Sequence, residues 1–128
     1  MTQIAEFFIP GMPRTARKNK GPEQIKWEAH VIAELRRQWG KDLIAPDTKV
    51  QLDILFKISM EPTDPTGHGP DLDNLMKPVL DGIAEVLLPG AGDGKNGDFL
   101  VYRLNVAKEI VGEGEGVVIA MNRIPKTN

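Results

Sequence analysis

The sequence contains no cysteine among its 128 residues. Disulfide bonds, thiolate zinc sites and cysteine nucleophiles are therefore excluded. No apolar run approaches the roughly 18–20 residues that are needed to span a bilayer. The first residues, MTQIAEFFIPGMP, also lack a basic region followed by a long apolar stretch, so they do not resemble a signal peptide. We therefore expect a cytoplasmic protein.

Neither sign of charge is in large excess, since the formal net charge is −2 at pH 7. Net charge alone therefore does not indicate a nucleic-acid-binding protein. Hydrophobic residues make up 41% and charged residues 27% of the chain, as in soluble globular proteins. The length is that of one domain with a substantial hydrophobic core, so we expect residues 1–128 to form a single domain.

The hydrophobic pattern predicts four strands and two helices. Alternation of apolar and polar residues is clearest from Val50 to Ile58, which predicts a strand with one wet face. The predicted strands are 3–9, 49–60, 100–110 and 117–124, and the predicted helices are 22–39 and 72–87. The order β-α-β-α-β-β leads us to expect an α+β fold, with one mixed sheet and two helices packed on it.

Charge is unevenly distributed along the chain. Acidic residues crowd into positions 61–98, whereas four basic residues and no acidic one lie between positions 14 and 20: Arg14, Arg17, Lys18 and Lys20. A basic strip beside an acidic cluster suits a phosphate ligand that is held by side chains and cut with the help of metal ions. From charge alone, a solvated basic loop is the simpler explanation of the strip.

The acidic cluster centres on the segment GPDLDNLMKPVLDG at positions 69–82. On a helix, Asp73, Lys77 and Asp81 are spaced i, i+4 and i+8, so they drift only about 80° around the axis. Asp71 lies just before this helix and can turn toward the same end. Carboxylates at such spacing repel one another unless a cation or a proton compensates them. The segment therefore predicts a metal site.

Structural explanations of the same residues are also open. Asp71 could cap the helix, and the helix dipole could account for Asp73. Lys77 could form surface salt bridges with Asp73 and Asp81, or it could stabilise charge that develops on a phosphate. Pro78 is unusual inside a helix, because it removes a hydrogen bond and crowds a carbonyl. It predicts either a kink or a later helix start.

Two common ligand-binding motifs are excluded. The acidic segment does not match the calcium loop D-x-[DN]-x-[DN]-G, because Leu75 and Met76 occupy the later positions. The segment 90–95 is not a phosphate-binding P-loop, since it follows a predicted helix and Asn96 replaces the required Ser or Thr.

The segment PDLDNLMKPVLDGI, followed by a strand that opens with Asp and ends in Lys, resembles the RusA-type Holliday junction resolvases. The early segment FFIPGMPRTAR also resembles that family's opening strand and proline-rich turn. The resemblance implies an endonuclease that acts on four-way DNA junctions. It further implies a Mg²⁺ cofactor, for which Mn²⁺ could substitute, and a homodimer.

The resemblance also implies which residues form the site. The catalytic residues would be Asp71, Asp73, Lys77 and a third acid, Asp98, which lies ten residues before Lys108. The metal ligands would be Asp71, Asp73 and Asp98, with Asp81 as a further candidate. Family members often have two adjacent acids where this chain has Gly97-Asp98, and Asp93 is the nearby alternative.

Aspartate oxygens suit Mg²⁺, which can activate water and stabilise a leaving oxygen in phosphodiester hydrolysis. The basic residues Arg14, Arg17, Lys18 and Lys20 are candidates for contacts with backbone phosphates. The segment 63–68, which ends in His68, lacks the basic run that is common in the family's best-known member. A metal or substrate role for His68 stays open. Two other readings are a non-catalytic or weakly active junction-binding module and an ordinary α/β domain whose acids cap a helix.

Overall fold

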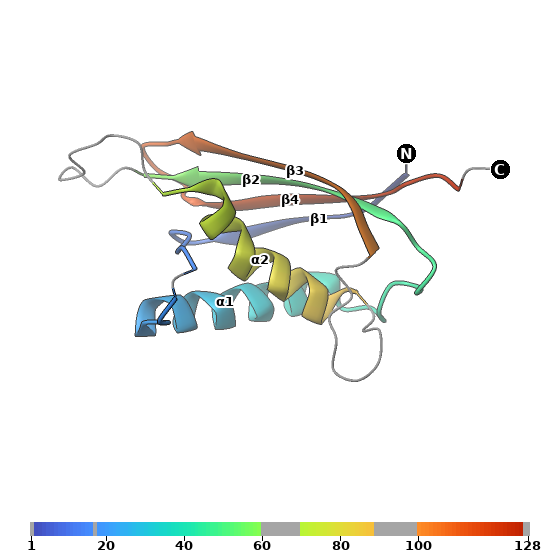
Figure 1. The fold of residues 1–128 in the computed structure, drawn as a ribbon, viewed down its shortest axis with the longest axis horizontal. Coiled ribbons are helices and arrows are strands. Elements are labelled where there is room, and N and C mark those ends of the chain that lie inside the picture. The colour runs from blue at the N-terminus through green and yellow to red at the C-terminus, as the bar shows by residue number, and fades with distance from the viewer. Residues whose placement is uncertain (1, 17, 60–69, 89–99, 127–128) are drawn as a thin grey trace.

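The computed structural model describes residues 2–16, 18–59, 70–88 and 100–126. Six elements follow one another in the predicted order, with bounds within two residues of those predicted (Figure 1). They are β1 (Thr2–Pro10), α1 (Pro22–Trp39), β2 (Val50–Ile58), α2 (Leu72–Val86), β3 (Val101–Ile110) and β4 (Gly116–Arg123). The predicted α+β fold is confirmed.

The four strands form one mixed sheet in the order β1-β4-β2-β3. β4 is antiparallel to both of its neighbours, whereas β2 and β3 are parallel. Parallel neighbours need a crossover connection, and α2 supplies it. Both helices lie on the same face of the sheet (Figure 1). Neither helix, in the part of the chain that the structure describes, has the length and apolar character to cross a membrane.

The core lies between this face and the two helices. The alternation predicted for β2 is confirmed, because Leu52, Ile54 and Phe56 are at most 2% exposed. α2 contributes a stripe at helical spacing, and α1 contributes Val31 and Leu35. Burying such apolar side chains supplies most of the stability of a domain of this size. α2 is thereby fixed against both the sheet and α1.

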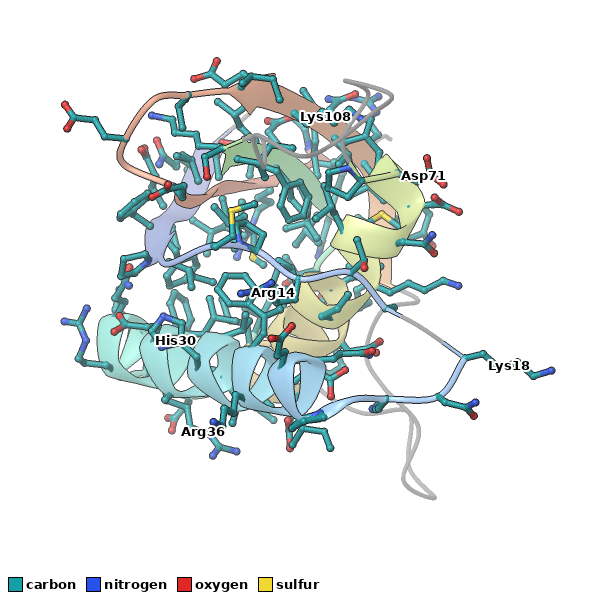
Figure 2. The ribbon with its side chains drawn as sticks, turned by 90° about the vertical axis from the view of Figure 1, so that its left-hand side faces the viewer. Arg14, Lys18, His30, Arg36, Asp71 and Lys108 are labelled. Atoms are coloured by element: carbon teal, nitrogen blue, oxygen red, sulfur yellow. The ribbon has the colours of Figure 1, made fainter. Side chains whose placement is uncertain are left out.

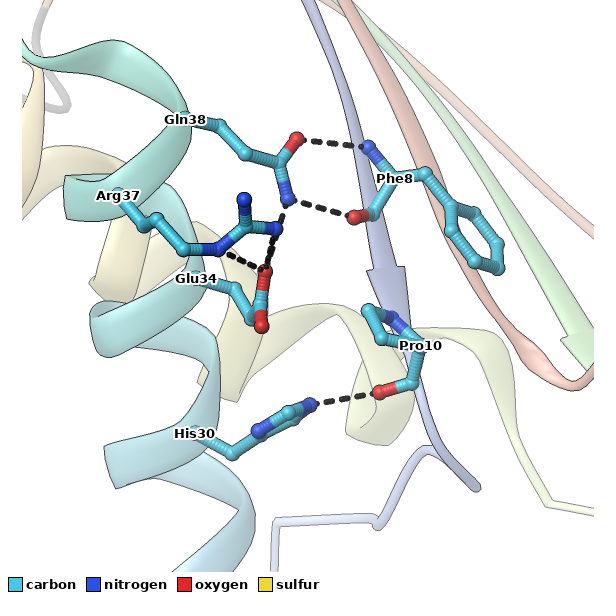
Figure 3. A network of polar contacts seen from close by, with 6 residues as sticks. All are labelled: Phe8, Pro10, His30, Glu34, Arg37 and Gln38. Atoms are coloured by element: carbon cyan, nitrogen blue, oxygen red, sulfur yellow. Dashed lines mark hydrogen bonds and ion pairs between the residues drawn. The ribbon is translucent and has the colours of Figure 1, made fainter.

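The outer edge of β1 is closed by side chains of α1 (Figure 3). The amide of Gln38 accepts from the Phe8 N–H at 3.2 Å and donates to the Phe8 carbonyl at 2.7 Å. His30 Nε2 donates to the Pro10 carbonyl at 2.6 Å. Gln38 and Arg37 each donate a hydrogen bond to the Glu34 carboxylate. The hydrogen bond from Arg37 is the main cause of the lowered pKa of Glu34. The backbone groups of Phe8 and Pro10 that face away from the sheet at this edge are thus hydrogen-bonded to side chains of α1.

β3 forms the opposite edge of the sheet, and its packing differs from a regular alternation. Its register against β2 is interrupted near Tyr102, because Val101 pairs with Val50 whereas Arg103 pairs with Gln51. Tyr102 and Leu104 are exposed, although regular alternation along the strand would put them on the same face as the buried Leu100. The irregularity and the edge position together explain the difference.

Candidate functional site

α2 begins where the acidic motif begins. Asp71 is its N-cap residue, and the first helical hydrogen bond runs from the Leu75 N–H to the Asp71 carbonyl at 3.0 Å. The Asp71 side chain makes no capping hydrogen bond and is exposed. Capping therefore does not occupy its carboxylate, which remains available for a ligand.

Asp73 and Lys77 lie on the first two turns of α2, and both side chains are exposed. No ion pair joins Lys77 to Asp73 or to Asp81 among the described residues, so the salt-bridge explanation of Lys77 is not supported. Asp81 lies two turns farther along, a rise of about 12 Å from Asp73. A metal role for Asp81 would therefore concern a different ion from one that Asp71 and Asp73 share.

Pro78 lies inside a continuous helix that begins at Leu72, so of the two alternatives that the sequence left open a later helix start is excluded. A proline at this position leaves the carbonyl of Asn74 without its helical partner. The backbone N–H of Ala16 donates to this carbonyl at 2.8 Å. Pro78 thus frees an acceptor on α2, and the chain is fixed to the helix at Ala16, which lies between the basic residues of the strip. The two sequence features that looked unrelated are joined by one hydrogen bond.

Lys108 fixes the chain just before Asp71. Its Nζ donates to the Pro70 carbonyl at 2.8 Å, and its side chain is partly buried. Figure 2 shows Lys108 and Asp71 at the same end of the molecule. A charge-assisted bond of this kind holds the entry to α2 more firmly than a neutral one. Lys108 is therefore a positioning residue for the acidic end of α2.

A hollow of about 440 Å³ lies between the basic strip and α2. Its lining brings both predicted groups together: Ala16, Lys18, Lys20, Gln24, Glu28, Asn74, Lys77, Pro78 and Asp81. A second hollow follows the chain from Met12 to Gln24 and reaches Pro70. Gln24 lines both hollows, so they adjoin each other beside the start of α2.

The described basic residues differ in how they are held. Arg14 lies 3.5 Å from a carboxylate oxygen of Glu23, and Lys20 lies 3.1 Å from one of Glu28. Lys18 makes no such pair among the described residues, and it extends away from the rest of the molecule (Figure 2). Arg14 and Lys20 are thus oriented by α1, whereas Lys18 projects into solvent.

Four predicted residues lie outside the described residues: Arg17, His68, Asp93 and Asp98. β3, which follows Asp98 in the sequence, begins at the opposite end of the sheet from the start of α2 (Figure 1). Along the strand, Val101 is roughly 23 Å from Lys108. Within the described ranges, no group of three or more acidic or histidine side chains is placed to hold a metal ion.

A crossover junction endodeoxyribonuclease RusA from Aquifex aeolicus (strain VF5) is 32% identical to this chain over 107 residues. The match covers 84% of this chain and 74% of that relative. The chain belongs to the RusA family. This confirms the family that the motif and the opening segment resemble. No family model matches the chain.

Two contacts in this RusA family member were not predicted from the sequence: the Ala16–Asn74 hydrogen bond and the Lys108–Pro70 hydrogen bond. Both join residues that are far apart in the chain, and both end on backbone carbonyls. The proline inside an otherwise strong helical pattern was the one available signal for the first. Nothing in the sequence marks Pro70 as an acceptor.

Proposed function

We propose that the protein is a Mg²⁺-dependent endonuclease that cuts phosphodiester bonds in branched DNA and resolves Holliday junctions. The observation that carries this proposal is the start of α2. There, Asp71 and Asp73 are exposed, neither has an ion-pair partner among the described residues, and the docked basic strip lies alongside. Membership of the RusA family supports the same function.

The donor set fits a divalent cation of the Mg²⁺ type. Mg²⁺ is usually bound through one or two carboxylates, with water and substrate phosphate oxygens at its other positions. Asp71, which makes no capping hydrogen bond, and Asp73 supply such carboxylates. A bound Mg²⁺ would supply an activated water and charge stabilisation at the phosphate. Mn²⁺ has the same preference for oxygen ligands and would substitute.

The remaining site residues follow from the motif. Lys77 projects from the helix face next to Asp73, where its ammonium can stabilise charge on a phosphate. Asp98 is proposed as the third acid. Three single variants test it: Asp98→Asn should abolish junction cleavage, whereas Asp93→Asn and Asp81→Asn should retain it. Loss of cleavage in Asp93→Asn with retention in Asp98→Asn would move the assignment to Asp93.

Arg14, Arg17, Lys18 and Lys20 would bind backbone phosphates, which position DNA without reading its sequence. The described members of this strip line the hollows that adjoin the start of α2. A four-way junction has two strands to cut symmetrically. A homodimer with two-fold symmetry presents two equivalent sites for them.

The second candidate function is a junction-binding module with little or no cleavage activity. It is favoured by the absence of a third acid beside Asp71 and Asp73 among the described residues. A cleavage assay on a synthetic four-way junction and a linear duplex, with and without Mg²⁺, separates the two. We expect Mg²⁺-dependent cleavage of the junction alone. Junction binding without cleavage would establish the second candidate instead.

A further inference from the structure

Another hollow, of about 480 Å³, lies at the end of the sheet where β2 begins and β4 ends, away from the start of α2 (Figure 1). Among the described residues, its lining carries three cations and one carboxylate, although the whole chain has a formal net charge of −2. The lining residues are Ala45, Asp47, Thr48, Lys49, Arg123, Ile124 and Lys126. A local excess of positive charge in an acidic chain indicates a surface for an anionic ligand.

Lys49 and Arg123 are held on neighbouring segments of the backbone. Arg123 pairs with Val50, the residue after Lys49. The Ile124 N–H donates to the Lys49 carbonyl at 2.9 Å. The backbone that carries the two cationic side chains is therefore fixed before any ligand binds, which lowers the entropic cost of binding.

The carboxylate of the lining is engaged by the third cation. Lys126 Nζ lies 3.1 Å from Asp47 Oδ2, and its hydrogen bond is the main cause of the lowered pKa of Asp47, to which the charge of Arg123 contributes. Neither Lys49 nor Arg123 has an ion-pair partner in the part of the chain that the structure describes. Lys49 instead lies over the ring of Tyr102, 4.9 Å from its centroid, and a ring orients an ammonium group without cancelling its charge. Two positive charges thus remain for a ligand.

The exposure of these side chains indicates the kind of anion. Lys49 and Arg123 are both exposed, so they can contact a polyanion that lies across the surface. A small ligand, in contrast, is usually enclosed on most of its surface. Tyr102, beside Lys49, is 60% exposed, and aromatic side chains among cations are typical of surfaces that bind nucleic acids.

We propose that Lys49 and Arg123 bind backbone phosphates in an arm of the branched DNA, at a site separate from the basic strip of residues 14–20. The proposal rests on the proposed function, because it assigns a further contact with the same DNA. Phosphate contacts of this kind position DNA without reading its sequence.

The two ends of β3 give the separation of this site from the acidic motif. Lys49 precedes β2 where Val50 pairs with Val101, whereas Lys108, near the other end of β3, is bonded to the chain just before α2. Val101 and Lys108 are roughly 23 Å apart along the strand. This length equals about seven base pairs at 3.4 Å each, so one phosphate group cannot reach both sites of a chain. The proposed site therefore positions an arm at a distance from the start of α2 of the same chain.

Fluorescence anisotropy with a labelled linear duplex and a labelled four-way junction, without Mg²⁺, tests the site between about 50 and 200 mM salt. Each lost phosphate contact should reduce the slope of log affinity against log salt by about 0.9. Across this range, the affinity of Lys49→Ala and of Arg123→Ala should therefore fall about 3.5-fold less than that of the wild type, and the affinity of the double variant about 12-fold less. Lys41→Ala is the matched control and should keep the wild-type slope. Lys41 is also an exposed lysine over an aromatic ring, 5.2 Å from the centroid of Trp39, but it lies outside the hollow.

NMR titrations of the wild-type chain separate DNA from other anions. The linear duplex should shift the backbone amide signals of Lys49 and Ile124, whereas inorganic phosphate and polyglutamate at the same total charge should leave them in place. Equal shifts with polyglutamate would assign the hollow to an acidic protein segment, and shifts with inorganic phosphate alone would assign it to a small anion. Either result would overturn the proposal.

Unchanged salt slopes in both single variants would overturn it as well. Both side chains are exposed, so circular dichroism should report unchanged folding in all variants. The outcome is separable from the proposed function. A wild-type chain that cleaves junctions while the variants keep its salt slope would refute only this site. Reduced slopes in the variants of a chain that does not cleave would refute only the nuclease function.

Discussion

Gly82 sets how closely the two helices approach, and Gly82→Ala tests that contact. A Cβ at this position would lie 2.8 Å from Val31 Cγ1 and 3.5 Å from Leu35 Cδ1. Both side chains of α1 are fully buried, at 0% exposure. Val31 is β-branched and therefore stiff in a helix, so it cannot simply rotate away from the added methyl group. The substitution forces a shift between α1 and α2.

The size of the effect follows from two opposing contributions. Overpacking of a buried site costs about 1–3 kcal/mol. Replacing glycine by alanine inside a helix recovers about 1 kcal/mol of intrinsic propensity. The net expectation is a loss of about 1 kcal/mol in the free energy of unfolding. The same change at Gly112, where an added Cβ would meet no atom within 4 Å, should stay within about 0.5 kcal/mol of wild type.

Urea unfolding followed by circular dichroism measures both variants, with a third test in a Val31→Ala background. Val31→Ala removes the atom that the new methyl group would meet, so Gly82→Ala should be neutral or stabilising there. Stabilisation of the wild-type background by Gly82→Ala would refute the close contact. An equal cost in both backgrounds would show that Val31 is not the cause.

Three further predictions concern the loop, the β1 edge and the entry to α2. Lys18→Ala should weaken binding to junction and duplex DNA alike and reduce the slope of log affinity against log salt by about 0.9, whereas Lys41→Ala should not change the slope. At Glu34 the folded pKa is lowered, so its stabilisation is present at neutral pH and is lost as the pH falls below about 4. The stability difference between wild type and Glu34→Gln in urea unfolding should therefore shrink below about pH 4, and a constant difference would contradict this. Lys108→Met should lower the free energy of unfolding in urea by about 1.5–3 kcal/mol. It should also slow single-turnover cleavage by refolded protein, and unchanged cleavage would rule out the positioning role of Lys108.

The sequence predicted the elements of the fold well, because each element buries one face. The alternation of Leu52, Ile54 and Phe56 and the helical stripe of α2 can only be buried in a strand and a helix, respectively. The strand order could not be predicted, since nothing local places β4 between β1 and β2. The register irregularity at Tyr102 could not be predicted either, because it arises only in the pairing of β3 with β2.

The candidate site was predicted in part. Asp71, Asp73 and Lys77 lie together at the start of α2 because they are close in the sequence and their spacing is helical. The sequence left open whether Pro78 kinks the helix or delays its start. The structure instead shows a continuous helix, in which the Asn74 carbonyl that Pro78 leaves free accepts a hydrogen bond from the Ala16 N–H. Contacts of this kind depend on how distant segments fold together, so no local pattern reveals them.

The most direct measurement of the proposed function is cleavage of a synthetic four-way junction by Asp73→Asn in the presence of Mg²⁺, with junction binding measured in parallel. Asparagine keeps the shape of the side chain but removes the charge that a divalent cation needs. We predict that cleavage falls about a hundredfold or more while binding is retained, and that Asp42→Asn, an exposed acid after α1, cleaves normally. Cleavage by Asp73→Asn at the wild-type rate would contradict a metal-dependent nuclease site at the start of α2.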